Sequence, residues 1–328
     1  MLKFILNRLV MGFFVLIGVS FIVFTLLYIS PQDAAETILG DMATEEDKRI
    51  FREQNGLNDP FIVQYTHYIM NIVQKGDLGT SYQTKQPVSQ EIFQRFPITF
   101  RLAGCSILLA AFIGISLGLL AAVNQNTWFD NTCTFFSILG VSVPNFWQGM
   151  MMIIFFSVVL KLLPPSGFST PLHWIMPVFT LGTSASASIM RMTRSSVLEV
   201  IRQDYTRTAY AKGLSVRKIV SVHVLKNALI PIITVIGITF GRLLGGAVMV
   251  ESIFSIPGLG KLMVDAIKFK NIPLVQGSVL YMAFVLVLMN IIVDILYAYI
   301  DPRIRAHYVP DERKKDDIPD GKEEGAAS

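Results

Sequence analysis

Six stretches of this chain are long and apolar enough to cross the hydrocarbon core of a membrane as helices. A helix needs about 20 residues to span about 30 Å of hydrocarbon. The stretches lie at residues 9–29, 99–123, 131–160, 174–192, 229–250 and 278–300. Of the 328 residues 52% are hydrophobic and only 16% are charged. A typical water-soluble protein contains fewer hydrophobic and more charged residues than this. The sequence therefore predicts an all-α integral membrane protein with six transmembrane helices.

The first apolar stretch follows a short basic start that contains Lys3 and Arg8. A secretory signal peptide has similar flanks, but its apolar run is shorter and a cleavage site of small residues follows it. Because neither condition is met here, we expect the first stretch to be a retained membrane span.

The loop between the fourth and fifth stretches is the most basic one and sets the predicted orientation. It has two acids, Glu199 and Asp204, against eight Lys and Arg: Arg191, Arg194, Arg202, Arg207, Lys212, Arg217, Lys218 and Lys226. Cytoplasmic loops carry such an excess. Residues 191–230, the basic loop, are therefore predicted to be cytoplasmic. Counting spans outward from it places both the N- and the C-terminus in the cytoplasm.

This topology divides the chain into four predicted regions. Residues 1–30 form a cytoplasmic N-terminus and the first transmembrane helix, and residues 31–97 form an external cap region between the first and second spans. Residues 98–308 form a five-helix core that includes the basic loop, and residues 309–328 a disordered cytoplasmic tail, because that tail is charged and poor in apolar residues. Within the cap, Thr44 followed by three acids predicts the start of a short helix.

The basic loop is too polar to enter lipid and too apolar to be a solvated linker. Asp204 can begin a short helix, and Gly213 can end it in the left-handed conformation. Ser215 can then cap a second helix that runs into the membrane. Three small residues leave a face of low relief on the first helix: Thr208, Ala209 and Ala211. The pattern predicts that another protein covers this face, although an ordinary positively charged cytoplasmic loop is the alternative.

The same loop resembles the signature of permease subunits of ATP-binding-cassette importers, which reads Glu-Ala-Ala, three residues, Gly, and later Ile-x-Leu-Pro. Arg207-Thr208-Ala209 stand at the triplet, Gly213 at the glycine and Leu229-Ile230-Pro231 at the end. Arg207 replaces the Glu, and the spacing from Gly213 to Pro231 is longer than the general pattern. Both departures resemble the dipeptide, oligopeptide and nickel branch of that family.

Three further motifs carry the resemblance to this branch along nearly the whole chain. They are SVPNFW at residues 142–147, ESIFSIPGLG at 251–260 and DPRIR at 301–305. With the basic loop, four separated motifs agree in order and in topology, so the resemblance is specific.

The resemblance implies a permease subunit that forms half of a translocation pore in the plasma (inner) membrane of a prokaryote. The implied partners are a second homologous permease, two cytoplasmic ATPase subunits that carry the ATP and Mg, and an extracytoplasmic substrate-binding protein. A groove of the ATPase would receive the helix at 205–212. Pro231, at the first turn of the fifth span, would be a rigid junction between that helix and the pore. The implied ATPase-coupling residues are Asp204, Tyr205, Arg207, Thr208, Ala209, Ala211, Lys212 and Gly213.

An ionisable residue inside a span is costly unless it faces protein or water. Arg242 lies in the fifth span among three glycines with the four-residue spacing of helix packing sites, Gly237, Gly241 and Gly245. We expect Arg242, together with Glu251, to line the translocation path; the alternative is a structural pair between these two. Asp294 in the sixth span has the same two interpretations, and there a structural role is favoured.

The chain itself shows no cofactor site and no catalytic site. Gly258-Leu259-Gly260-Lys261 fails the phosphate-loop pattern at Ser255 and Leu262, Cys105 and Cys133 lack metal-ligand spacing, and nothing suggests nucleic acid. A hydrolase built on Ser116 lacks a histidine within the spans. Peptides are the expected substrate, with nickel or a metal chelate as the alternative, and a secondary transporter is the rival from another class.

Overall fold

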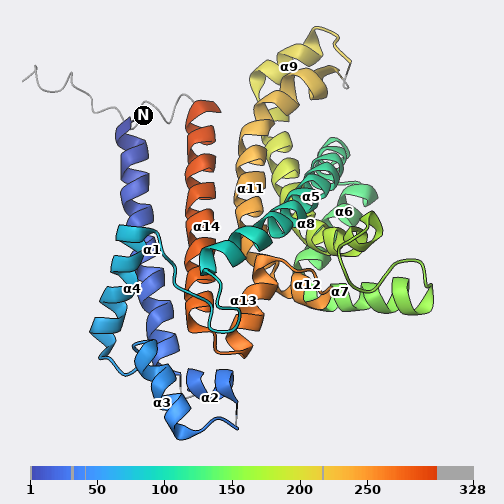
Figure 1. Ribbon diagram of the computed structural model, residues 1–328. Helices are drawn as coiled ribbons and strands as arrows, with labels where there is room; N and C mark the ends of the chain where they lie inside the picture. The colour runs from blue at the N-terminus through green and yellow to red at the C-terminus, as the bar shows by residue number, and fades with distance from the viewer. Residues whose placement is uncertain (1, 31–32, 41, 216–217, 301–328) are drawn as a thin grey trace, which may run out of the picture.

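The computed structural model describes residues 2–30, 33–40, 42–215 and 218–300, and the regular structure of this part of the chain is helical (Figure 1). The DPRIR motif and the predicted tail at 309–328 lie outside the described residues. The helices are α1 (Leu2–Ile29), α2 (Ala34–Leu39), α3 (Glu45–Gln54), α4 (Phe61–Lys75), α5 (Val88–Val123), α6 (Trp128–Ser142), α7 (Asn145–Met152), the π-helix η1 (Ile153–Val159), α8 (Pro171–Ile201), α9 (Asp204–Ala211), the π-helix η2 (Ile219–Val224), α11 (Leu225–Gly246), α12 (Val248–Ile253), α13 (Leu259–Lys268) and α14 (Ile272–Ile300).

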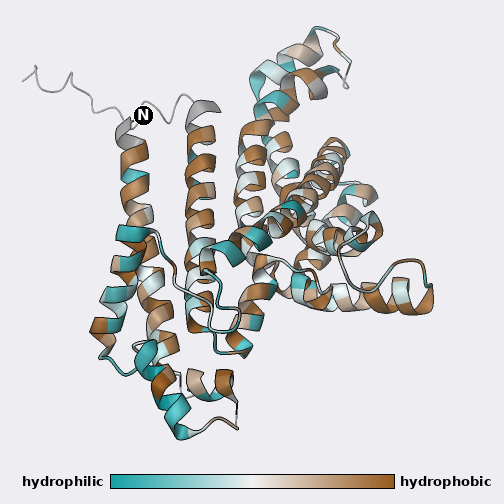
Figure 2. Cartoon of the chain, in the orientation of Figure 1, coloured by the Kyte–Doolittle hydropathy of each residue, from teal (hydrophilic) through white to brown (hydrophobic). Residues whose placement is uncertain are grey.

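Four described helices are long and apolar enough to cross a membrane, over Ile5–Ile29, Val88–Val123, Leu225–Gly245 and Ile272–Leu296. A fifth crossing results if α6 and the α7–η1 segment count as one bent span. Figure 2 shows the apolar character of α1 and α14, and the more polar surface of α3 and α9 at opposite ends of the molecule. A multi-pass helical membrane protein is therefore shown, whereas the count of six spans is not.

The fourth predicted span, 174–192, lies within α8, which is long but not apolar enough to qualify as a span on its own. This helix packs against α5, α6, α7 and α11, and many of its buried residues are small or polar, such as Thr180, Ser186 and Thr193. Because protein rather than lipid surrounds this helix, its side chains need not be strongly apolar.

The third predicted span, 131–160, is not one straight helix. It bends by 99° between α6 and α7. Val143 is extended, with φ −79° and ψ 120°, and Pro144 follows it without an N–H to continue the helical ladder. The SVPNFW motif therefore marks a break, and the expectation of a single straight span was wrong.

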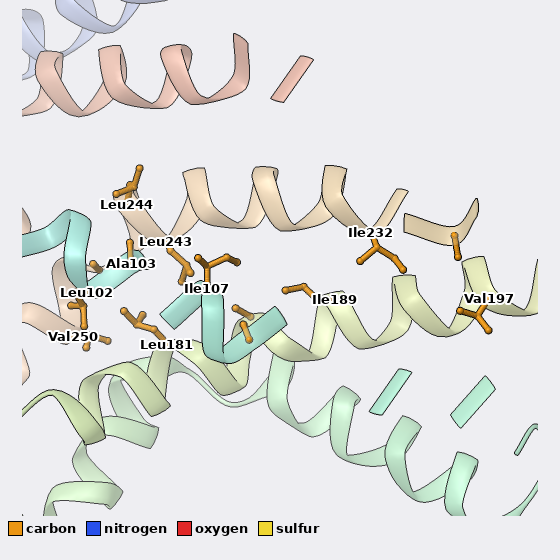
Figure 3. Close-up of a cluster of buried hydrophobic side chains, with 14 of the residues drawn as sticks. Leu102, Ala103, Ile107, Leu181, Ile189, Val197, Ile232, Leu243, Leu244 and Val250 are labelled. Atoms are coloured by element: carbon orange, nitrogen blue, oxygen red, sulfur yellow. The ribbon is translucent and has the colours of Figure 1, made fainter. Parts of the chain in front are cut away.

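The core lies where α5, α8 and α11 meet. Figure 3 shows buried side chains from these three helices interleaved, among them Leu102, Ala103, Leu181, Ile189, Leu243 and Leu244. Glycines bring the backbones close: a Cβ on Gly114 would lie 2.8 Å from the Ser186 carbonyl oxygen of α8, and one on Gly237 would lie 2.4 Å from Cγ2 of Val293 on α14. The predicted packing role of the glycines in the fifth span holds at Gly237, whereas Gly245 faces open space.

The cap between α1 and α5 consists of α2, α3 and α4 and lies at the end of the molecule opposite α9 (Figure 1). Thr44 begins α3 as predicted: its Oγ1 accepts from Asp47 N at 3.2 Å, and the Asp47 carboxylate accepts from Thr44 N at 3.1 Å. Since α5 begins at Val88 and continues through Pro97, the predicted boundary at residue 97 falls inside a continuous helix.

Candidate coupling and translocation sites

The short helix α9 lies beyond the spans at one end of the molecule (Figure 1). It begins at Asp204, and an acidic residue in the first turn suits the positive end of the helix dipole. Gly213, with φ +78°, supplies the left-handed turn that follows it. The sequence predicted both of these boundaries.

Two hydrogen bonds attach α9 to the neighbouring helices. Thr206 is buried, and its Oγ1 donates to the Val200 carbonyl oxygen of α8 at 2.9 Å. Asn227 Nδ2 of α11 donates to the Tyr205 hydroxyl at 2.9 Å. These two hydrogen bonds fix the position of α9 relative to both helices.

The outward surface of α9 carries most of the predicted coupling residues. Six of them are exposed besides Tyr205: Asp204, Arg207, Thr208, Ala211, Lys212 and Gly213. Ala209 is buried against the bundle instead, with 8% exposure, so the expectation that it forms part of the low-relief face was wrong. The exposed face thus combines short side chains with two cations, which suits a close-fitting partner of acidic character.

The connection from α9 to the membrane includes the π-helix η2. Ile219 N donates to the Ser215 carbonyl oxygen at 3.0 Å, and η2 then continues directly into α11. Pro231 lies inside α11, which begins at Leu225, so its predicted place in the first turn of that helix was wrong. Proline in a helix interior lacks an N–H for the carbonyl four residues earlier and favours a bend there.

The exposed face of α11 contains Arg242. Ile238, Arg242 and Gly245 recur at spacings of four and three, and all are exposed. Within the described part of the chain, Arg242 has neither a hydrogen bond nor an ion pair, so the alternative pairing with Glu251 is not formed. A guanidinium at this depth requires water or an anion.

Glu251 is fully buried and connects three helices. Its Oε1 accepts from Thr99 Oγ1 of α5 at 2.6 Å, and its Oε2 accepts from Lys261 N of α13 at 3.0 Å. Thr99 Oγ1 in turn accepts from Leu259 N at 2.8 Å. Burial raises the pKa of the Glu251 carboxyl above its ordinary value, although these hydrogen bonds oppose the rise. Glu251 therefore caps the start of α13 in this conformation and does not contact a solvent-filled path.

Gly258 and Gly260 make room for this carboxylate. A Cβ at Gly258 would lie 2.3 Å from Glu251 Oε1, and one at Gly260 would lie 3.0 Å from Oε2. The ESIFSIPGLG run is thus a structural unit in which the acid and the two glycines depend on one another.

Asp294 forms an ion pair with Arg8 of α1, with Arg8 Nε 3.1 Å from Asp294 Oδ2. This contact fits the structural interpretation of Asp294 and attaches α14 to α1. A second ion pair, between Arg194 Nε and Asp130 Oδ1 at 2.6 Å, connects α8 to α6. Arg194 therefore has a structural role in addition to the positive charge that it adds to the basic loop.

Sequence reasoning overlooked Arg101 and Thr99. Arg101 is an exposed cation in the apolar run of α5, and the criterion that singled out Arg242 would have found it. Thr99 gave no such signal, because its partner Glu251 is 152 residues away. Among the described residues, no group of three His, Cys, Asp or Glu side chains could hold a metal ion.

Two family models match the chain. Residues 114–306 match the binding-protein-dependent transport system inner membrane component, and residues 1–103 match the N-terminal part of such membrane components. A structure of the MetNI methionine ABC transporter in inward-facing conformations has a TM-score of 0.52 with 18% identity, and the match covers 65% of this chain and 97% of that one. That likeness supports the fold alone.

Curated relatives agree over most of the chain. The dipeptide transport system permease protein of Alkalihalophilus pseudofirmus is 39% identical over 93% of this chain and 100% of the relative. The glutathione transport system permease protein of Salmonella choleraesuis is 41% identical over 93% and 99%, and the dipeptide permease of Escherichia coli K12 is 39% identical over 93% and 99%. The chain therefore belongs to the inner membrane components of binding-protein-dependent transport systems and is an ABC transporter permease of the dipeptide and oligopeptide branch, not itself an enzyme.

Proposed function

We propose that this chain forms half of the translocation pore of an importer for dipeptides or short oligopeptides, and that α9 transmits the motion of an ATPase to that pore. The observation that carries the proposal is α9 itself, a short helix that has an exposed outward face and is hydrogen-bonded to α8 and α11. The relatives named for dipeptide and glutathione transport support peptides as the substrate class. They do not favour nickel.

The complete transporter would contain a second homologous permease, two ATPase subunits that bind ATP and Mg on the cytoplasmic side, and a substrate-binding protein outside. The charge of the basic loop supports a cytoplasmic position for α9 and both termini in the inner membrane of a prokaryote. The cap and α13, at the opposite end in Figure 1, would then face the binding protein.

The connections between the helices support alternating access as the mechanism. Closure of the ATPases on ATP would displace α9, and α9 would move α11 through η2. The outer end of α11 continues into α12, whose Glu251 holds the start of α13. Motion at α9 would therefore alter the packing of α12 and α13 at the opposite end. Arg242, on the exposed face of α11, is the proposed contact with substrate in the path.

Uptake measurements with reconstituted protein test this function. Vesicles that contain this chain with its copurifying subunits and binding protein should accumulate labelled dialanine only when ATP is supplied. Accumulation by this chain alone, driven by an ion gradient, would instead identify a secondary transporter. ATP-driven uptake of nickel in place of the peptide would refute the substrate class and keep the permease role.

A further inference from the structure

The helix α4 of the cap turns its polar side inward and its apolar side outward. Its polar side lines a cavity of about 720 Å³ between the end of α1, the cap and the first turn of α14, through Gln64, His67 and Asn71. Its other side carries exposed apolar residues that do not line this cavity: Ile62, Met70 and Val73. A helix on the surface of a water-soluble domain shows the reverse arrangement, with its apolar side toward the protein.

The outward side of α4 is suited to a solvent other than water. Val73 is 74% exposed and Ile62 67%. The Thr66 hydroxyl on this side donates to the Ile62 and Val63 carbonyl oxygens at 2.8 and 3.0 Å, so it needs no water. Apart from Lys75 at its end, α4 contains no Asp, Glu, Lys or Arg, whereas seven of the ten residues of α3 are charged. The two helices of the cap therefore differ in the surroundings that they suit.

A hydrogen bond fixes the depth of α4 relative to α1. The Ser20 and Tyr65 hydroxyl oxygens lie 3.0 Å apart, and Ser20 belongs to the apolar span Ile5–Ile29. At about 1.5 Å per residue, Ser20 lies about 13.5 Å from the end of that span at the cap. The 25-residue span is about 37.5 Å long, against about 30 Å of hydrocarbon. Even if the whole excess projects at the cap, Ser20 lies about 6 Å inside the hydrocarbon, and Tyr65 lies beside it.

Aromatic contacts hold α4 along the half of α1 that is nearer the cap (Figure 1). Phe24 of α1 is only 5% exposed, because the rings of Phe61 and Tyr65 cover it at centroid distances of 5.3 Å each. Phe61 at the start of α4 also contacts Tyr28 in the last turn of α1, at 5.1 Å, and Tyr65, one turn later, reaches Ser20. From its first residue, α4 therefore runs away from the end of α1 and toward greater depth.

We propose that α4 lies in the membrane leaflet on the side of the cap, with its outward side against lipid acyl chains. An amphipathic helix binds at the boundary between headgroups and acyl chains more strongly as it buries more apolar area. Lipid is the occupant that α4 fits, because the outward side offers a protein partner neither a charge nor an unbonded hydroxyl. Only the identity of the leaflet, the outer one, rests on the orientation proposed above. The expected external cap would then be surrounded by water at α3 but not at α4.

Spin labelling of the full chain, with its copurifying subunits in phosphatidylcholine nanodiscs, tests the proposal. Cys105 and Cys133 are first replaced by alanine, and a nitroxide is then attached to Met70→Cys on α4 or to Ile50→Cys on α3. Ile50 is the matched control, because it is also an exposed apolar residue of the cap, at 41%, but lies on the charged helix. Oxygen, which concentrates in lipid, should relax the label at position 70 severalfold more than chromium oxalate, which stays in water. The order should be reversed at position 50.

Equal access of chromium oxalate to the two positions would place α4 in water and overturn the proposal. Low access of both reagents to position 70 would show that a protein subunit covers α4, which also overturns it. Copurification of the ATPase verifies that each labelled variant is assembled. Neither readout requires peptide uptake, so lipid contact by α4 and the proposed function can fail separately.

A charge placed on the outward side of α4 gives a second measurement. Met70→Asp should lower the thermal unfolding midpoint in the nanodiscs by several degrees more than Ile50→Asp, because a carboxylate in hydrocarbon is costly. Both changes replace an exposed apolar residue of a cap helix by the same acid. Equal losses of stability would contradict lipid contact at α4.

Discussion

At the scale of single residues, the buried Glu251 side chain restricts which residues fit at the positions around it. Its carboxylate occupies the space that side chains at positions 258 and 260 would need, and it accepts a hydrogen bond from Thr99 on a distant helix. The sequence placed an acid and two glycines in one run, but neither burial nor the partner on α5 can be read from one sequence. A long-range contact of this kind depends on the packing of whole helices.

Gly258→Ala should lower the thermal unfolding midpoint of the detergent-solubilised chain. The added Cβ would lie 2.3 Å from Glu251 Oε1, and such overpacking costs about 1–3 kcal/mol. Gly245→Ala is the control, because nothing lies within 4 Å of the corresponding Cβ. A midpoint for Gly258→Ala equal to that of Gly245→Ala would contradict the described fit.

The Asp33–Arg52 pair should make the stability of the cap depend on pH. Burial raises the pKa of Asp33, but hydrogen bonds from Arg52 and from Ala35 N, with the charge of Arg52, lower it more, so the pKa lies below its ordinary value of 3.8. The ionised form is favoured in the folded cap, and its contribution is lost as the pH falls through the folded-state pKa. The difference in unfolding midpoint between wild type and Asp33→Asn should therefore be present at pH 7, shrink as the pH falls below 3.8 and vanish below the folded-state pKa. A constant difference over that range would argue against the pair.

At the scale of elements, the sequence predicts helices well where the pattern is local. The start of α3 at Thr44 and the turn at Gly213 follow from capping and backbone preference. The sequence misled where a neighbouring helix decides: apolar content alone joined α6 to α7 across Pro144 and placed Pro231 at a helix start. Hydropathy measures transfer into lipid, and it says little about helices that other helices enclose.

Gly213→Val should weaken the association of the ATPase with the permease. The φ of +78° is strained for any side chain and most for a β-branched one, so the turn after α9 would rearrange and displace the outward face. Copurification of the ATPase should fall severalfold. Gly40→Val is the matched control, since Gly40 has φ +79°, also has nothing near its Cβ position and lies in the cap. Equal copurification with both variants would show that the turn after α9 does not position the ATPase contact.

At the scale of the whole molecule, the two ends are connected through α11 and α12 to Glu251, and Thr99 attaches that unit to α5. Topology, charge and motifs predicted from the sequence that an ATPase moves the end with α9, the driven end. They also predicted that the end with the cap, the receiving end, faces the substrate-binding protein. They could not predict this hydrogen-bonded joint, because it joins residues from separate helices. Coupling between the two ends requires an element with two arrangements, and both ends must shift the equilibrium between these arrangements.

Thr99→Val should therefore separate ATP hydrolysis from transport. Valine is close to threonine in shape but cannot donate to Glu251 or accept from Leu259 N, so the start of α13 would lose its hydrogen bond to α5 while α9 keeps its own contacts. ATP hydrolysis by the reconstituted transporter should persist, with about tenfold less peptide imported per ATP, a ratio that corresponds to about 1.4 kcal/mol. Thr132→Val, which removes only a local bond to the Trp128 carbonyl oxygen on α6, should retain the normal ratio. A normal ratio in Thr99→Val would show that motion reaches the receiving end by another route, whereas a loss of both activities would indicate that Thr99 maintains the fold and not the coupling.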